Sequence, residues 1–127
     1  GSDGNAISPT GVYGKERPHP RFYGTYPRVL GRYVRDNPSI LTLEEAVHKM
    51  TGFPAERMNF ENRGTITKGH VADLVVFNPD TVTDQATFED PHRYPKGIPY
   101  VLVNGELVVS KGKHTGARPG KILRRGV

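Results

Sequence analysis

The chain has 127 residues, 35% of them hydrophobic, and it carries 15 glycines and 11 prolines, residues that favour turns and loops. A chain of this size buries roughly two thirds of its unfolded surface, so we expect one compact unit with a modest core, or part of a larger protein. Because the sequence has no cysteine, disulfides, thiolate zinc ligands and a cysteine nucleophile are excluded. No apolar run approaches the ~20 residues that cross a bilayer, and no leader is recognisable, which predicts a cytoplasmic chain without membrane contact.

The net charge is +5, with 18 Lys and Arg against 13 Asp and Glu, and the isoelectric point is about 9.6. Such a basic balance is compatible with nucleic-acid binding. The basic residues are nevertheless spread along the chain, and the dense cluster is confined to Lys121, Arg124 and Arg125. This distribution is more typical of a solvated or partner-facing surface, so we predict no nucleic-acid partner and keep a basic nucleic-acid binder as an alternative.

Residues 1–24 show no regular hydrophobic period, because five glycines and three prolines interrupt them. We therefore expect an irregular segment. A loop this long usually serves a site or is held in place by something outside it.

This first segment contains the candidate functional residues. Asp3 stands between Ser2 and Gly4, whose small size lets another group approach the carboxylate closely. His19 and Arg21, separated by one proline, can orient an anion. An ordinary turn or a frayed terminus explains Asp3 equally well, and a solvated turn explains the other two.

Two amphipathic helices and a short third helix are predicted over residues 25–60. The first has an apolar stripe at helical spacing, formed by Tyr26, Val29, Leu30, Tyr33 and Val34. The second follows a Thr-x-x-Glu capping box and ends at a glycine, and a proline starts the third. The residues that mark these ends are Thr25, Thr42 with Glu45, Gly52, Pro54 and Met58. Because the helices are amphipathic, they need a surface to lie against.

Residues 61–127 change character toward β structure. Residues 74–77 form a continuous apolar run stopped by Asn-Pro, which predicts a strand buried on both faces. Two further apolar runs, 100–103 and 106–109, flank an Asn-Gly pair. A type I′ turn needs positive φ at both central residues, so Asn-Gly predicts a hairpin there.

The predicted sheet is incomplete. Residues 78–98 contain three prolines and a glycine and predict a long surface excursion, and residues 121–123 predict one more short strand. Three or four strands without closing partners leave edges that something else must cover.

Catalytic signatures that need no family knowledge are missing from the sequence. The histidines do not form the His-x-His or His-Glu-x-x-His spacings that place two imidazoles on one metal; they are His19, His48, His70, His92 and His114. The sequence also has no Gly-x-Ser-x-Gly elbow and no phosphate-binding P-loop. Serine hydrolysis and nucleotide binding therefore lack support.

Several longer motifs nevertheless share one pattern. They are Ser-Asp-Gly at 2–4, His-Pro-Arg at 19–21, Gly-Thr-Tyr-Pro-Arg-Val-Leu-Gly at 24–31, Gly-x-x-Ala-Asp-Leu-Val-Val-Phe at 69–77 and Val-x-Val-Asn-Gly at 101–105. Through these motifs the chain resembles the C-terminal third of the D-aminoacylases, the N-acyl-D-amino-acid deacylases of the amidohydrolase superfamily. The last two motifs mark amidohydrolases broadly, whereas those at 19–21 and 24–31 point to the D-aminoacylase branch.

The resemblance implies an α+β chain that is part of a larger fold. Residues 1–60 would end a metal-dependent (β/α)8 barrel, and residues 61–127 would add strands to a small β-sandwich domain. The aspartate of Ser-Asp-Gly lies at the end of the eighth barrel strand in such enzymes, so the implied catalytic residue is Asp3. Its implied role is to accept a proton from the zinc-bound water and to pass it to the leaving amine. Ser2, His19 and Arg21 are the candidates for substrate binding.

The resemblance further implies zinc as cofactor and an N-acyl-D-amino acid as small-molecule substrate. The family's main zinc ligands would precede Gly1, so we expect Asp3 next to the metal, no metal ligand set within this chain, and the missing N-terminal part of the enzyme as its partner. We therefore expect no deacylase activity from the isolated chain. The alternative from a different class is a non-catalytic β-rich interaction module derived from an amidohydrolase tail.

Overall fold

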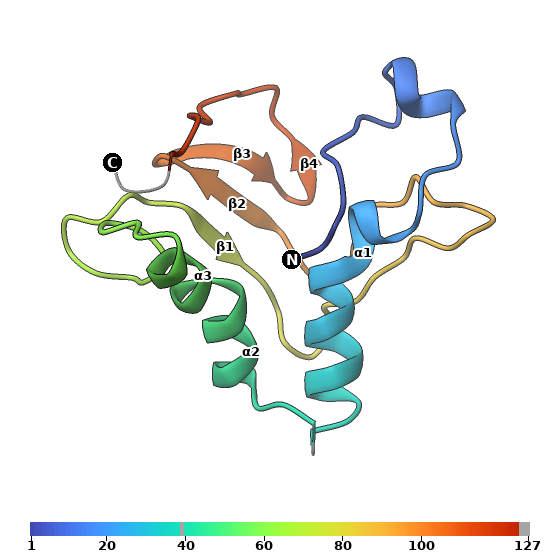
Figure 1. The fold of residues 1–127 in the computed structure, drawn as a ribbon. Helices are drawn as coiled ribbons and strands as arrows, with labels where there is room; N and C mark the ends of the chain where they lie inside the picture. Colours follow the sequence, from blue (N-terminus) through green and yellow to red (C-terminus); the bar gives the residue numbers. More distant parts are fainter. Residues whose placement is uncertain (39, 125–127) are drawn as a thin grey trace. The chain divides into compact units, whose positions relative to one another are not determined.

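The computed structural model describes residues 1–38 and 40–124, and the chain divides into two compact units. Unit 1 consists of Gly1–Ile40 and Asn78–Gly97, and unit 2 consists of Leu41–Phe77 and Ile98–Val127. Figure 1 shows the helices and strands in sequence colours. Arg125 of the predicted basic cluster lies outside the described residues. The division at residue 60 that the resemblance implies stays a prediction about the larger fold.

Unit 1 contains a short 3-10 turn and one long helical segment. The elements are η1 (Val12–Lys15), α1 (Arg21–Arg28) and η2 (Val29–Arg35), the last of which is a π-helix that continues α1. The prediction that residues 1–24 are irregular throughout is therefore wrong at η1 and at the start of α1. The helix begins at Arg21 because Pro20 has a backbone φ of −52°, which suits a helix start, and its carbonyl accepts the Gly24 N–H. Thr25 is not the cap; its hydroxyl donates to the Arg21 carbonyl at 3.0 Å.

The core of unit 1 forms where residues 78–97 pack beside this helical segment. Leu30 from the helix, and Val82 and Ala86 from the other segment, are buried. Glycines permit the close approach, since a Cβ on Gly31 would meet the Val82 carbonyl oxygen at 2.9 Å. The predicted surface excursion is thus wrong for Val82 and Ala86, because the helix that covers them lies about fifty residues away in sequence.

Unit 2 begins with two helices, α2 (Leu43–Met50) and α3 (Gly52–Arg57). The predicted capping box is confirmed: Thr42 Oγ1 accepts the Glu45 N–H at 3.2 Å, and the Glu45 carboxylate accepts the Thr42 N–H at 2.9 Å. The predicted third helix exists, but it starts two residues before Pro54, with Gly52 as its first residue rather than as a terminator.

The sheet of unit 2 is antiparallel, in the order β1-β2-β3-β4. Its strands are β1 (Leu74–Val76), β2 (Tyr100–Val103), β3 (Glu106–Ser110) and β4 (Lys113–His114). The predicted hairpin is confirmed, with Val103 paired to Glu106 and with φ of 49° at Asn104 and 80° at Gly105. The short strand predicted at 121–123 does not form, and β4 completes the sheet instead.

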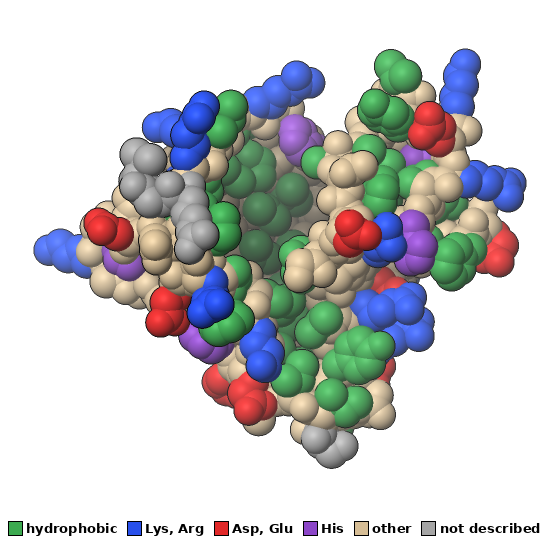
Figure 2. Space-filling view, in the orientation of Figure 1, with side chains coloured by type: hydrophobic (Ala, Val, Ile, Leu, Met, Phe, Trp, Pro, Cys, Tyr) green, Lys and Arg blue, Asp and Glu red, His purple; other side chains and the backbone are tan. Residues whose placement is uncertain are grey.

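The prediction that the run at 74–77 is buried on both faces is wrong. Val75 and Val76 are 54% and 49% exposed. β1 is an edge strand that pairs only with β2. Its side chains project from the faces of the sheet, and the described residues do not cover those of Val75 and Val76. Figure 2 shows hydrophobic side chains, in green, uncovered on the face in view. Among the described helices, no segment is long and apolar enough to cross a membrane.

Candidate functional site

Asp3 and Arg21 meet at the start of α1. Arg21 Nη2 lies 2.9 Å from Asp3 Oδ2, and Arg21 Nε donates a hydrogen bond to the Asp3 backbone oxygen at 3.0 Å. Asp3 has a backbone φ of 51°, a left-handed conformation that aspartate adopts more readily than most residues. Its side chain is 86% exposed, so the carboxylate remains open to a reactant while it pairs with Arg21.

The small neighbours of Asp3 hold this turn in place. The Ser2 hydroxyl accepts the Gly4 N–H at 3.2 Å. A Cβ at Gly4 would lie 3.1 Å from Phe22 Cα, so glycine favours the close passage of the chain beside α1. Ser2 therefore has a local structural bond beside its predicted contact with substrate.

His19 is engaged on one side of its ring. Its Nδ1 accepts the Arg21 backbone N–H at 3.0 Å, and the ring packs edge-on against Phe88 at a centroid distance of 5.0 Å. Because Nδ1 acts as an acceptor, the proton of the neutral ring resides on Nε2. The structure thus brings Asp3, His19 and Arg21 together around the first turn of α1.

A cavity of about 410 Å³ opens beside α1 within unit 1. His19 and Arg21 line it together with Arg28 and Arg32 from later turns, and residues 84–89 also contribute to its lining. Asp3 is not among the described residues that line it. The cavity places hydrogen-bond donors of three arginines on one side.

The carboxylate of Asp84 at this cavity is a feature that sequence reasoning missed. Its side chain is only 3% exposed, and Oδ2 receives Arg28 Nε at 2.8 Å and Nη2 at 2.6 Å. Oδ1 has no hydrogen-bond partner among the described residues, and Arg32 Nε lies 3.7 Å away. A buried carboxylate needs such a cationic partner. Asp84 and Arg28 are 56 positions apart, so the local sequence gave no signal of the pair.

A second missed feature joins Tyr23 to His92. The Tyr23 hydroxyl lies 2.9 Å from His92 Nδ1, and His92 Nε2 lies 2.9 Å from the Glu16 carbonyl oxygen. Burial raises the pKa of the Tyr23 phenol, and the nearby Tyr94 phenol raises it further. The phenol therefore keeps its proton at neutral pH and acts as a hydrogen-bond donor.

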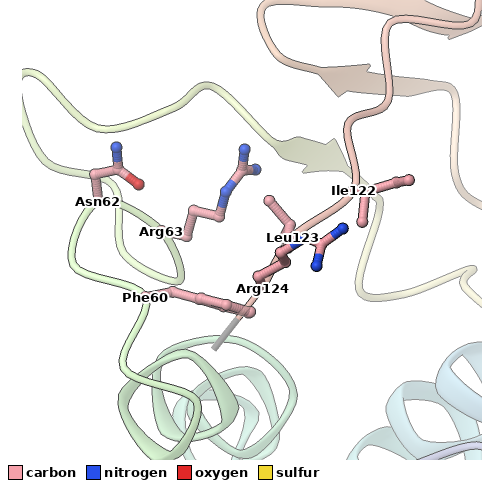
Figure 3. A pocket seen from close by; sticks show the side chains of 6 residues that line it. All are labelled: Phe60, Asn62, Arg63, Ile122, Leu123 and Arg124. Atoms are coloured by element: carbon pink, nitrogen blue, oxygen red, sulfur yellow. The ribbon is translucent and has the colours of Figure 1, made fainter. Parts of the chain in front are cut away.

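Unit 2 has a pocket of its own, of about 280 Å³ (Figure 3). Phe60, Asn62 and Arg63 form one side, and Ile122, Leu123 and Arg124 form the other. Arg63 is already paired with Asp73 and also donates to Asn104 Oδ1 at 3.2 Å. Since the described residues that line the pocket include no carboxylate and no histidine, it lacks a group for acid–base chemistry.

The residues that the structure describes do not assemble a metal site. No group of three or more His, Asp or Glu side chains within residues 1–38 and 40–124 could hold an ion. The carboxylate of Asp3, the residue expected next to the metal, is paired with Arg21. A single exposed carboxylate does not satisfy the four-coordinate geometry of zinc, so these residues do not by themselves fit that cofactor.

Comparison with known proteins gives a consistent family. The model of an amidohydrolase family matches residues 14–109. The chain is 49% identical over 119 residues to a D-aminoacylase of Alcaligenes xylosoxydans xylosoxydans, covering 94% of this chain and 24% of that protein. It is 45% identical over 127 residues to an N-acyl-D-aspartate deacylase of the same organism, covering 99% of this chain and 24% of the relative.

Solved structures agree with these sequence matches. A crystal structure of D-aminoacylase superposes with a TM-score of 0.82 at 50% identity, covering 87% of this chain and 23% of that one. An N-acyl-D-glutamate deacylase from Bordetella bronchiseptica, complexed with zinc and a phosphonate inhibitor, superposes with a TM-score of 0.77 at 49% identity, covering 85% of this chain and 22% of that one.

These similarities establish that the chain belongs to the amidohydrolase family. Within that family it is similar to the D-aminoacylases and the N-acyl-D-amino-acid deacylases, as the motifs predicted. The chain spans about a quarter of the length of the curated relatives that it matches.

Proposed function

We propose that the chain is the C-terminal part of an enzyme that hydrolyses N-acyl-D-amino acids to a carboxylate and a D-amino acid. The observation that carries this proposal is the Asp3–Arg21 pair, an exposed carboxylate held against a guanidinium, in a chain that is 45–50% identical to deacylases along nearly its whole length. The alternative of a non-catalytic interaction module is not favoured, since the relatives that this chain matches along nearly its whole length are enzymes.

In this proposal Asp3 is the acid–base residue. Its carboxylate takes a proton from the attacking water and returns it to the nitrogen of the leaving amine, two transfers that one carboxylate can perform in sequence. The 86% exposure of the side chain leaves room for substrate, and Arg21 keeps Oδ2 in a fixed direction. A general base within hydrogen-bond reach of the water is the geometric requirement.

Arg21 is proposed to bind the carboxylate of the substrate. A guanidinium has five N–H donors, and two of those of Arg21 face Asp3. The remaining N–H groups can donate hydrogen bonds to a second anion. His19 lines the same wall of the cavity with Arg21, and its Nε2–H can donate to an acyl oxygen. Ser2 directly precedes Asp3 and is also proposed to contact the substrate.

The remaining three quarters of the enzyme are proposed to supply what this chain lacks. We propose that they form most of the (β/α)8 barrel, the rest of a β-sandwich around the uncovered strand β1, and the zinc ligands. The described residues do not fit zinc by themselves, so zinc is assigned to the larger enzyme. The isolated chain is accordingly proposed to be inactive.

The test is an assay of the full-length enzyme that carries this sequence, with N-acetyl-D-amino acids bearing neutral, aspartate and glutamate side chains. The release of free amino acid from at least one D-substrate, with the L-enantiomers as controls, is expected. If none of the three D-substrates is hydrolysed when metal is supplied, the proposal is overturned. The 127-residue chain, assayed alone with zinc, is expected to release none.

A further inference from the structure

His92, which has no role in the proposed reaction, makes two hydrogen bonds to residues on either side of His19 and Arg21. His92 Nδ1 lies 2.9 Å from the Tyr23 hydroxyl, and His92 Nε2 lies 2.9 Å from the Glu16 backbone oxygen. Glu16 precedes His19 by three residues, and Tyr23 follows Arg21 by two. One side chain therefore joins both ends of the short segment that carries His19 and Arg21.

The chemistry of the two bonds fixes the form of the ring. A carbonyl oxygen only accepts, so His92 Nε2 must carry a proton and donate to Glu16. In the neutral ring Nδ1 is then an acceptor, and the Tyr23 hydroxyl supplies its proton. Both nitrogens are thus satisfied in one tautomer, which holds the ring in one orientation.

The surroundings of the ring restrict its movement further. Tyr23 packs edge-on against His92 at 5.7 Å and against Tyr94 at 5.5 Å. His92 is flanked by a buried proline at position 91 and by Pro95, whose fixed φ angles stiffen this part of the chain. Between Glu16 and Tyr23, two more prolines limit the conformations of the bracketed segment.

We propose that His92 is a positioning residue that closes residues 16–23 into a fixed loop and thereby sets Arg21 against Asp3. This inference rests on the proposed function. Asp3 lies outside the closed loop and Arg21 lies inside it, so loss of the His92 bonds displaces the guanidinium relative to the carboxylate. The effect of such a loss therefore falls mainly on substrate binding by Arg21.

The test uses a matched pair of variants in the full-length enzyme. Tyr23→Phe removes the hydroxyl that bonds His92, and Tyr94→Phe removes a hydroxyl that makes no hydrogen bond to the described residues. Tyr23→Phe and His92→Ala are each expected to raise KM about tenfold or more while kcat changes less, since the displaced Arg21 guanidinium loses charge-assisted hydrogen bonds to the substrate. Tyr94→Phe is expected to keep the KM of the parent. The double variant Tyr23→Phe/His92→Ala is expected to be no worse than His92→Ala, because both changes break one unit.

Hydrogen–deuterium exchange in the same variants tests the loop without any activity. Peptides that cover residues 16–23 are expected to exchange faster in Tyr23→Phe and His92→Ala than in Tyr94→Phe. Equal exchange and equal KM in Tyr23→Phe and Tyr94→Phe would overturn the proposal. An inactive parent enzyme would overturn the proposed function alone, and unchanged exchange in His92→Ala would still refute the closed loop.

Discussion

Arg21 holds Asp3 at two points, through Nη2 on the carboxylate at 2.9 Å and through Nε on the backbone oxygen at 3.0 Å. One guanidinium thus contacts both the side chain and the backbone of the left-handed turn at Asp3. Arg21 is the first residue of α1 and follows Asp3 by 18 positions, with η1 between them, so the pair ties the irregular start of the chain to a helix.

Replacing Asp3 with asparagine is expected to lower kcat of the full-length enzyme about 10²- to 10⁴-fold, because an amide cannot take up the proton of the attacking water. The metal content, measured by elemental analysis, is expected to stay nearly unchanged. Asp80→Asn is the matched control, since Asp80 is an exposed carboxylate of the same unit. Turnover of Asp3→Asn within a few-fold of the parent would refute the assigned role.

Asp84→Asn is expected to lower the unfolding free energy by about 1–3 kcal/mol, measured by urea denaturation, because it removes the buried carboxylate that pairs with Arg28. Asparagine has nearly the same volume, so the loss reports charge and hydrogen bonding rather than a cavity. Asp90→Asn is the control, because both side chains of the Asp90–Arg93 pair that it breaks are exposed. Its unfolding free energy is expected to change by less than about 0.5 kcal/mol. Similar losses in both variants would contradict the importance of the buried pair.

Gly31→Ala is expected to destabilise the chain by about 1–3 kcal/mol, despite the better helix propensity of alanine. The new Cβ would meet the Val82 carbonyl oxygen at 2.9 Å, and Arg35 Nη1 holds that oxygen from another side at 2.7 Å. Gly120→Ala is the control, because nothing lies within 4 Å of its Cβ position. If Gly31→Ala is as stable as Gly120→Ala in thermal unfolding, the backbone near Val82 moves away from the new Cβ at no cost, and the prediction is refuted.

Glu45 is expected to make the stability of the chain depend on pH. The hydrogen bond from the Thr42 backbone N–H, followed by the bond with the Thr42 side chain, lowers the pKa of Glu45 below its ordinary value of 4.5. The folded state therefore binds this proton less readily than the unfolded state. The resulting stabilisation is present above about pH 4.5 and is lost as the pH falls through the lowered value.

Glu45→Gln keeps a capping-box residue but cannot titrate, so its unfolding free energy is expected to fall less between neutral pH and pH 3 than that of the parent. Glu44→Gln, one residue earlier in the same first turn, leaves the Glu45 bonds in place and serves as the control. Parallel pH profiles for the parent and for Glu45→Gln would refute the linkage.

The parts that the sequence determined by itself are local. The capping box of α2 depends on two residues three positions apart, and the hairpin depends on an Asn-Gly pair that accepts positive φ. The motifs around Asp3, Arg21 and Asn104 likewise sufficed to indicate the family. Each of these signals is complete within a few neighbouring residues, so no distant contact was needed to recognise it.

The tertiary structure decided what depends on residues far apart in the chain. Val82 is buried because a helix fifty residues earlier covers it, and Val75 and Val76 of β1 are exposed because the described residues do not cover their side chains. Asp84 finds its charge partner 56 residues away, and His92 reaches Glu16 across 76 residues. A carboxylate or an imidazole looks the same in the sequence whether or not such a partner exists, because burial and pairing are properties of the folded chain. For this reason the sequence alone predicted the candidates Asp3, His19 and Arg21, while only the fold showed which side chains hold them in place.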